Sequence, residues 1–192
     1  MTEYSITLTK PSTIRDWLRL WRLYRRAFPH YERKPFFMIL RTKHRGCTDV
    51  WCIRQNGAFA GLAITMAQGE LVLLDYFAVS ETQRGSGLGS RALHLLQQEY
   101  AGKRLFLEIE STETDAPNRP ERLRRKQFYL RNGMSELGVH VSLFGVEMEL
   151  LGFACVLTFA EYQNLYTAVL GSWTRSHVCK SGEDFEKKLD KA

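Results

Sequence analysis

The chain has 192 residues, of which 44% are hydrophobic and 25% charged, and it carries a formal net charge of +6. These values are typical of one soluble globular domain, and no apolar run approaches the length that crosses a bilayer. The excess of positive charge suits an anionic partner. The first residues lack a basic-then-apolar signal peptide, so we expect a cytoplasmic protein.

The N-terminal part predicts a strand followed by a helix. Residues 4–10 alternate apolar and polar side chains, as a strand does. Ser12 or Thr13 can cap the helix that follows, and Pro29 ends it. Five arginines decorate the outer face of this helix, and we interpret them as a solvated surface.

Residues 30–35 form a polar connection into a second helix over about 36–42. Two strands follow, at 48–55 and 58–67, joined by Asn56-Gly57. Both turn residues tolerate positive φ, which favours a tight hairpin. Strands two to four are therefore expected to form an antiparallel meander.

The chain is organised around Leu71–Gly102. Leu71–Val79 is a short, nearly continuous apolar run, which is typical of a strand covered on both faces. A glycine-rich turn follows, and after it Leu88 begins a helical apolar pattern that stops before Gly102. A strand, a glycine turn and a helix start together indicate an anion site, because the first helical amides have no internal partner.

The spacing of the glycines narrows the choice of phosphate ligand. A P-loop needs Lys and Ser/Thr after its glycines, whereas Gly89 is followed by Ser90 and Arg91. The dinucleotide fingerprint needs a third Gly or Ala three residues after the second glycine, and Ser90 occupies that position. Both patterns fit poorly.

The segment Arg84-Gly-Ser-Gly-Leu-Gly89 resembles the acyl-CoA-binding signature Gln/Arg-x-x-Gly-x-Gly/Ala of the GNAT (Gcn5-related) N-acetyltransferase superfamily, in particular its small bacterial-type members. Tyr-Phe-Ala-Val79 before it is similar to the fourth strand of that family. The resemblance implies an α/β (α+β) fold with a central mixed, mostly antiparallel sheet of about seven strands. That sheet would splay between strands four and five and be flanked by four to five helices.

The second half of the chain continues this pattern. Expected elements are a strand at 104–110, a loop at 112–120, a helix at 121–132, two strands within 138–151, a helix from the capping box Thr158–Glu161 to Leu170, and a charged tail at 181–192. In the helix 121–132 we expect Leu123, Phe128 and Tyr129 to face inward. We place the acetyltransferase domain at 1–152, a helical extension at 153–180 and the tail at 181–192.

A second stretch supports the family resemblance. Leu107–Glu110 and, after a loop, Arg124–Gly133 are similar to the family segment that runs from strand five into a helix. Tyr129 matches the family's tyrosine beside the coenzyme sulfur. Many members carry Asn seven residues before it, a position that Arg122 takes here, while the nearest asparagine is Asn118.

The resemblance implies acetyl-CoA as co-substrate and no metal. A backbone N–H from Phe77 to Val79 would polarise the thioester carbonyl, and Tyr129 would be the general acid. Tyr31 and Glu32 would face the acceptor, with a surface loop as the equal alternative. The coenzyme-binding residues implied are Phe77, Ala78, Val79, Gln83, Arg84, Gly85, Ser86, Gly87, Leu88, Gly89, Ser90, Phe128 and Tyr129.

The general base is chosen from Asp75, Glu108 and Glu110, because carboxylates in an apolar sheet are costly unless paired or functional. We expect at least one of them to pair with Arg124 or Arg125. Strand alternation puts Glu108 and Glu110 on one side, and we favour Glu110 narrowly as acceptor-facing, with Asp75 next. Release of the proton to solvent stays open.

The four cysteines show no spacing of a zinc site, and we expect idle thiols. The first functional hypothesis is an N-acetyltransferase that acts on the primary amine of a small molecule, peptide or protein. The second is a catalytically idle acyl-CoA-binding domain, and the third is an RNA-binding protein that uses the arginine-rich first helix. Neither a membrane nor a nucleic-acid partner is expected, and a homodimer stays open.

Overall fold

The computed structural model describes residues 5–83 and 85–182, and they contain five α-helices and eight strands. The strands are β1 (Ile6–Thr9), β2 (Thr48–Gln55), β3 (Ala58–Gln68), β4 (Leu71–Val79), β5 (Arg104–Glu110), β6 (Ser135–Leu143), β7 (Val146–Gly152) and β8 (Val178–Lys180). The helices are α1 (Ile14–Ala27), α2 (Phe36–His44), α3 (Leu88–Glu99), α4 (Arg119–Arg131) and α5 (Phe159–Leu170). None of the described helices is long and apolar enough to cross a membrane.

The strands are hydrogen-bonded in the order β1-β2-β3-β4-β5-β7-β6-β8, and the sheet is mixed and mostly antiparallel, as expected. The parallel pairing joins Leu71–Leu73 of β4 to Arg104–Phe106 of β5. Two compact units share the chain. The first comprises the described residues of Met1–Ala67 and Leu74–Gly102, and the second those of Gln68–Leu73 and Lys103–Ala192.

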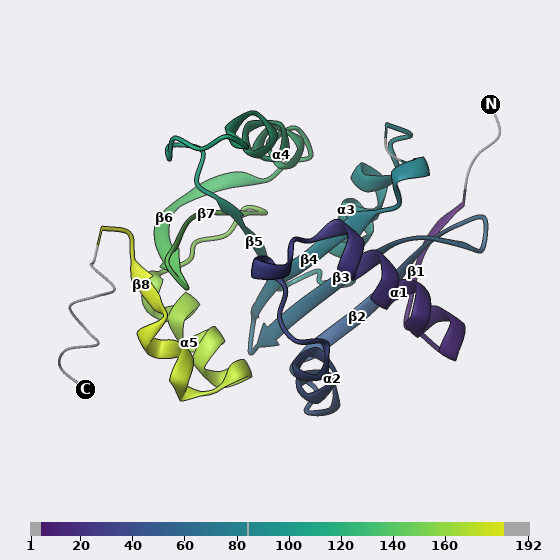
Figure 1. Cartoon of the computed structure of the whole chain (residues 1–192), viewed down its shortest axis with the longest axis horizontal. Helices are drawn as coiled ribbons and strands as arrows, with labels where there is room; N and C mark the ends of the chain where they lie inside the picture. Colours follow the sequence, from purple (N-terminus) through teal and green to yellow (C-terminus); the bar gives the residue numbers. More distant parts are fainter. Residues whose placement is uncertain (1–4, 84, 183–192) are drawn as a thin grey trace. The chain divides into compact units, whose positions relative to one another are not determined.

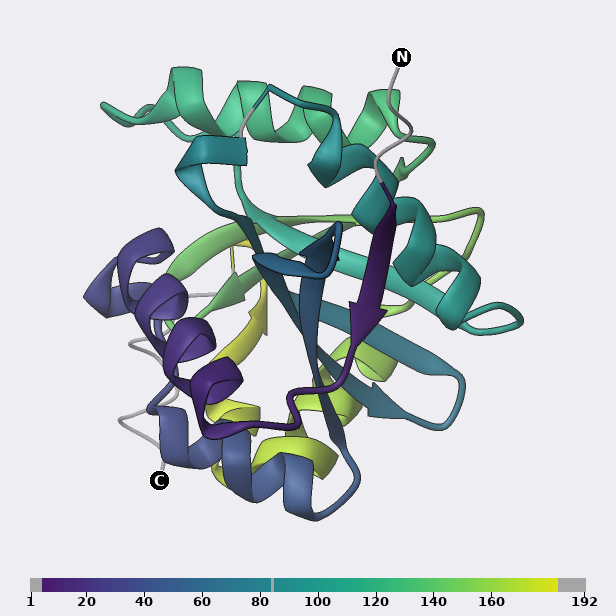
Figure 2. The ribbon, with the colours of Figure 1, turned by 90° about the vertical axis from the view of Figure 1, so that its right-hand side faces the viewer.

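In the first unit, helices cover both faces of β2–β4 (Figure 2). On one face α1 and α2 bury Leu20, Tyr24 and Ile39 against strand residues that include Leu62 and Tyr76. On the other face Leu88 and Ala92 of α3 pack with Ile53 and Ala60, and with the partly buried Phe77 and Val79 of β4. The end of β4 is therefore held between two apolar clusters, which fixes the backbone that precedes the glycine turn.

In the second unit, α4 and α5 lie on opposite sides of β5–β7 (Figure 1). The face of β5 that packs on α5 includes Phe106, whose ring lies 6.4 Å from that of Tyr162. On the other side Lys126 of α4 lies 2.5 Å from Glu149 of β7. The strands of the second unit thus contact a different helix on each side of the sheet, β5 contacting α5 and β7 contacting α4.

Two helices begin with complete capping boxes, at Thr13 for α1 and Thr158 for α5. The Arg54 guanidinium lies 2.7 Å from Asp16 and lowers the pKa of this capping carboxyl from 3.8 to about 2. Arg104 acts in the same way on Glu161, whose pKa falls from 4.5 to about 2. Both carboxylates therefore bind a proton more weakly in the folded chain than in the unfolded chain.

We expect the free energy of unfolding to decrease as the pH falls from about 4 to about 2, because Asp16 and Glu161 lose their ion pairs there. A lowered pKa contributes stability that is complete above the unfolded value and lost below the folded one. Asp16→Asn should lower stability at pH 7 and flatten this acid dependence in urea unfolding. The control Glu121→Gln removes only an exposed pair with Arg124 and should change neither. An unchanged slope in Asp16→Asn would contradict the assignment.

Within the described residues the sheet has eight strands, in agreement with the expected sheet of about seven, and they include the three-residue β8, which pairs with β6. The structure corrects one sequence-based expectation for α4. Leu123 is 37% exposed rather than inward-facing, whereas Phe128 is partly buried and Tyr129 buried. Tyr4 of the first predicted strand and residues 183–192 of the predicted tail lie outside the described residues.

Candidate active site

The glycine turn between β4 and α3 forms one side of the candidate site. Gly85 and Gly87 have φ angles of +78° and +79°, a conformation that L side chains adopt only with strain. Apart from the adjoining residues in the chain, no atom of the described residues lies within 4 Å of a Cβ built on either glycine. The Ser86 hydroxyl donates to the Gln83 carbonyl at 2.7 Å and closes the turn. The turn is therefore a backbone surface with open space beside it, in a conformation that requires glycine.

Helix α3 begins without the capping that α1 and α5 have. Its N-cap is Gly87, which has no side chain to accept from the first amides, and its first turn contains no acidic residue. Its N-terminus thus keeps the partial positive charge of the helix dipole. These features fit the negative phosphates of a coenzyme. The chain brings Phe77, Ala78 and Val79 directly before this turn, while Arg84, the charged residue of the motif, lies outside the described residues.

Gly61 of β3, which sequence analysis passed over, shapes the end of β4. A Cβ on this residue would lie 2.6 Å from the Ala78 carbonyl oxygen and 3.2 Å from the Val79 Cα. No side chain fits there, so the two backbones approach closely where the predicted coenzyme-binding segment begins. The apolar run around Gly61 gave no signal of this contact.

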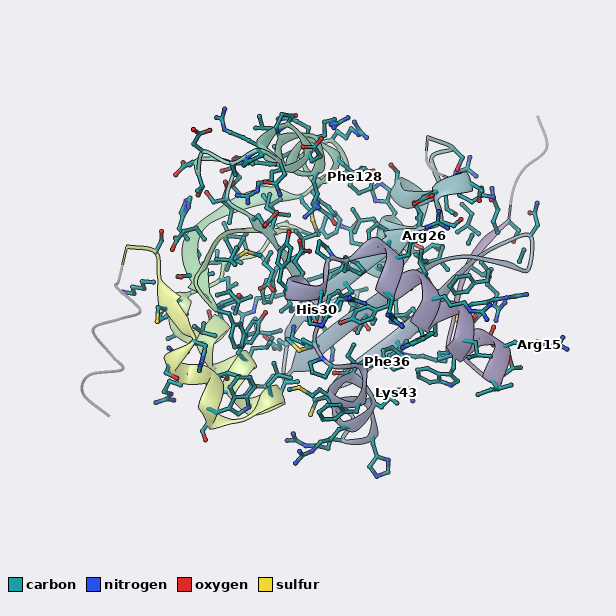
Figure 3. All side chains as sticks on the ribbon, viewed as in Figure 1. Arg15, Arg26, His30, Phe36, Lys43 and Phe128 are labelled. Atoms are coloured by element: carbon teal, nitrogen blue, oxygen red, sulfur yellow. The ribbon has the colours of Figure 1, made fainter. Side chains whose placement is uncertain are left out.

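The connection between α1 and α2 is tied to β4. Lys34 lies 2.5 Å from Asp75, and the side chains of this pair are 16% and 4% exposed. The Tyr76 hydroxyl donates to the Glu32 carbonyl and accepts from the Lys34 amide, both at 2.9 Å. Tyr31 is 72% exposed in the same connection. Figure 3 labels His30 and Phe36 at its two ends. The predicted acceptor residues Tyr31 and Glu32 therefore belong to a segment that is tethered to β4, the strand of the candidate base Asp75.

Tyr129 lies in the second unit, near the C-terminal end of α4. It is 8% exposed, and its ring packs edge-on against Phe128 at 5.1 Å. Burial raises the pKa of Tyr129 to about 12, against a smaller opposing effect of the Arg125 charge. Among the described residues, none exchanges a hydrogen bond with its hydroxyl. Tyr129 therefore keeps its proton at neutral pH and has it available for donation.

Glu110 is bound at the start of α4. Arg122 donates to one carboxylate oxygen and Asn118 to the other, each at 3.2 Å, and Glu110 is 7% exposed. The expected partner of a sheet carboxylate was Arg124 or Arg125, but Arg124 instead pairs with Glu121 on the helix surface. Arg122 and Asn118, which depart from the family pattern, thus anchor the loop and α4 to β5.

Glu108 is bound by the helix on the other side of the sheet. The Tyr162 hydroxyl donates to one carboxylate oxygen at 2.5 Å and the Tyr166 hydroxyl to the other at 2.7 Å. Glu108 and Glu110 are alternate residues of one strand, yet Glu108 accepts from side chains of α5 and Glu110 from side chains at the start of α4. Glu108 is partly exposed.

A buried ionic cluster between α4 and β7 was not predicted. Glu149, 3% exposed, accepts from Lys126, from the Thr112 amide at 2.5 Å and from the Thr112 hydroxyl at 2.7 Å. Burial opposes its ionisation, but these donors outweigh burial and hold the pKa of Glu149 below its ordinary value. The only indication of this cluster in the sequence is that Glu149 is a charged residue within a predicted strand. The cluster fixes the helix that carries Tyr129.

Within the described part of the chain, no three His, Cys, Asp or Glu side chains are grouped to hold a metal ion. The four cysteines are free thiols, and burial raises the pKa of Cys52 to about 11. This thiol is therefore protonated at neutral pH and is a poor nucleophile.

The family model of the acetyltransferase (GNAT) family matches residues 16–134. Comparison with curated protein sequences gives no match. A structure from Bacteroides thetaiotaomicron, described as an acetyltransferase of the GNAT family, has a TM-score of 0.72 at 20% identity, over 87% of this chain and 98% of its own.

Two further solved structures share the fold. The ribosomal-protein-S18-alanine N-acetyltransferase from Escherichia coli has a TM-score of 0.59 at 17% identity and covers 80% of this chain and 96% of its own. An aminoglycoside 6'-N-acetyltransferase complexed with coenzyme A has a TM-score of 0.61 at 13% identity and covers 77% and 95%. The fold of this chain is thus that of the GNAT enzymes. On the strength of the family match, which spans more than half its length, the chain belongs to the acetyltransferase (GNAT) family.

Proposed function

We propose that the protein is an N-acetyltransferase that moves the acetyl group of acetyl-CoA to a primary amine of a small molecule, peptide or protein. The start of α3 behind two positive-φ glycines carries the proposal, because Gly87 has no capping side chain and the Ser86 hydroxyl accepts from the Leu88 amide alone, at 3.4 Å, which leaves the next amides and an open backbone surface to phosphate. The coenzyme A in the aminoglycoside acetyltransferase structure is consistent with this co-substrate.

In this proposal the coenzyme lies along Phe77–Val79, where a backbone N–H polarises the thioester carbonyl, and its phosphates meet the turn at 83–90. Phe128 packs beside Tyr129, the general acid. Among the three carboxylates we now favour Glu108 as the residue nearest the reacting amine. The side chains of Asp75 and Glu110 are 4% and 8% exposed and are paired with Lys34 and Arg122, so an acceptor amine would have to displace a cation to reach either carboxylate. Glu108 is partly exposed and can be reached.

The proton balance assigns one task to each residue. Glu108 accepts the proton that the amine loses as its nitrogen bonds to the acetyl carbon, and it releases this proton to solvent before the next turnover. Tyr129 donates a proton to the sulfur as the carbon–sulfur bond breaks, and it recovers that proton from solvent. Because Tyr129 has a raised pKa, it is in its protonated form throughout the neutral range.

A thiol-release assay with acetyl-CoA and a panel of amines tests the proposal. The panel should contain an aminoglycoside, an aliphatic diamine, a peptide with a free N-terminal alanine and an N-blocked peptide with one lysine. We expect coenzyme A release above the hydrolytic background with at least one class. Mass spectrometry should show one acetyl group added per acceptor.

Two alternatives predict different results in the same experiment. An idle acyl-CoA-binding domain would bind acetyl-CoA in calorimetry but release no thiol with any amine. An RNA-binding protein would bind RNA with strong salt dependence through the exposed arginines of α1, of which Figure 3 labels Arg15 and Arg26. Thiol release that depends on an amine would contradict the idle acyl-CoA-binding domain. RNA binding with a weak salt dependence would contradict the RNA-binding protein.

A further inference from the structure

Helix α5 lies beyond the part of the chain that matches the family, which ends at residue 134. It is nevertheless firmly built into the second unit. Its capping box at Thr158 and the ion pair of Glu161 with Arg104, at 2.8 Å, fix its first turn to the start of β5. Its buried side chains, including Leu165 and Val169, are 0 to 1% exposed. The extension thus holds its inward face in a defined position against β5.

That inward face places two phenol groups on one carboxylate. Tyr162 and Tyr166 are four residues apart, so they share one side of the helix, and their ring centroids lie 5.1 Å apart. Each donates its hydroxyl to a different oxygen of Glu108, at 2.5 and 2.7 Å. Two separate donors, one for each oxygen, fix both the position and the plane of the carboxylate.

Packing alone does not explain why both residues carry a hydroxyl group. Phenylalanine at both positions would fill the same space without bringing a hydroxyl into a buried contact, and buried hydroxyls are costly unless they are bonded. A carboxylate has about four acceptor sites, and each tyrosine hydroxyl occupies one on a different oxygen of Glu108. The two hydroxyls therefore hold the orientation of the Glu108 carboxylate.

We infer that α5 is a functional part of the acyl-transfer site, in which Tyr162 and Tyr166 are positioning residues that hold Glu108 toward the acceptor amine. This inference rests on the proposed function. The tyrosines act through Glu108 and need not touch the substrate themselves. Helix α5 lies outside the matched family region, and it supplies two hydroxyl donors to the strand-five carboxylate of Glu108.

A double-mutant cycle tests the inference with the best amine from the panel. The variants are Tyr162→Phe, Tyr166→Phe, both together, Glu108→Gln and the combinations with Glu108→Gln. Loss of a positioned base costs about 10²-fold or more in kcat, and the Tyr162→Phe/Tyr166→Phe variant should approach the Glu108→Gln value. In the Glu108→Gln background the same tyrosine changes should alter kcat by less than about twofold, because their effect passes through the carboxylate. KM for acetyl-CoA should stay constant.

Tyr100→Phe is the matched control, since the Tyr100 hydroxyl is also buried and donates to a carboxylate, Asp49, at 3.0 Å in the first unit. It should lower thermal stability, leave kcat unchanged and show no coupling to Glu108→Gln. Should either single variant fail to fold, the other alone completes a cycle.

If the wild type releases no thiol with any amine, the proposed function fails and the role of α5 in catalysis fails with it. If the wild type is active but the tyrosine variants keep their kcat, the inference is overturned while the proposed function stands. The inference is likewise overturned if the decrease in kcat from the tyrosine changes adds to the decrease from Glu108→Gln.

Discussion

Tyr129→Phe should bind acetyl-CoA as the wild type does and turn over on the order of 10²–10⁴ times more slowly, the usual cost of losing a general acid. The change removes one oxygen and keeps the ring that packs against Phe128 at 5.1 Å. Because no described residue hydrogen-bonds to the Tyr129 hydroxyl, its removal leaves no partner unsatisfied. Single-turnover kinetics should show the loss in the chemical step, and calorimetry should show equal affinity for the coenzyme.

The raised pKa of Tyr129 gives this prediction a second observable. A general acid must be protonated, and Tyr129 loses its proton only near pH 12. Deprotonation of Tyr129 should therefore not lower the rate of the chemical step between about pH 8 and 10. Any decrease that the wild type shows in this range should also be present in Tyr129→Phe. Tyr100→Phe serves again as the control for loss of a buried hydroxyl. Equal single-turnover rates in Tyr129→Phe and the wild type would reduce Tyr129 to a packing residue.

The parts of this protein that sequence could predict are those decided by neighbouring residues. Thr13 with Asp16 and Thr158 with Glu161 form their capping boxes within one turn, so their spacing alone located two helix starts. The turn at Asn56-Gly57 was equally local, and its positive φ angles of 50° and 78° confirm the reason for predicting it. The glycine turn before α3 belongs to the same class, because strand, turn and helix are consecutive.

The carboxylate partners could not be predicted, because they depend on packing between distant segments. Tyr162 and Tyr166 lie 54 and 58 residues from Glu108, and nothing in their helical spacing indicates which strand residue they face. Arg122 was one of several cations near the start of α4, and only the fold selects it over Arg124. Leu123 was misplaced because α4 is so rich in charge that its apolar residues do not define one face. Strand β8 has three residues, too few for a period.

Gly87→Glu should abolish most coenzyme binding, if the turn before α3 holds the phosphates of acetyl-CoA as proposed. Gly87 has a φ of +79° and is the N-cap of α3, so glutamate there combines a strained backbone with a negative charge at the helix start. Like charges about 4 Å apart repel by about 1 kcal/mol in water and about 4 kcal/mol near a protein surface. The expected loss of affinity is thus about fivefold to about 10³-fold, measured by calorimetry with coenzyme A.

Two control variants separate charge from strain. Gly87→Ala brings the same backbone strain without the charge, and nothing lies within 4 Å of its added Cβ, so it should lose much less affinity than Gly87→Glu. Gly57→Ala introduces a comparable strain at φ +78° in the β2–β3 hairpin, with equally open space, and should leave coenzyme binding unchanged. Raising the ionic strength should narrow the gap between Gly87→Glu and Gly87→Ala, because salt screens the repulsion. Equal affinities in those two variants would mean that no anion binds at the start of α3, and the phosphate site would have to be sought elsewhere in the chain.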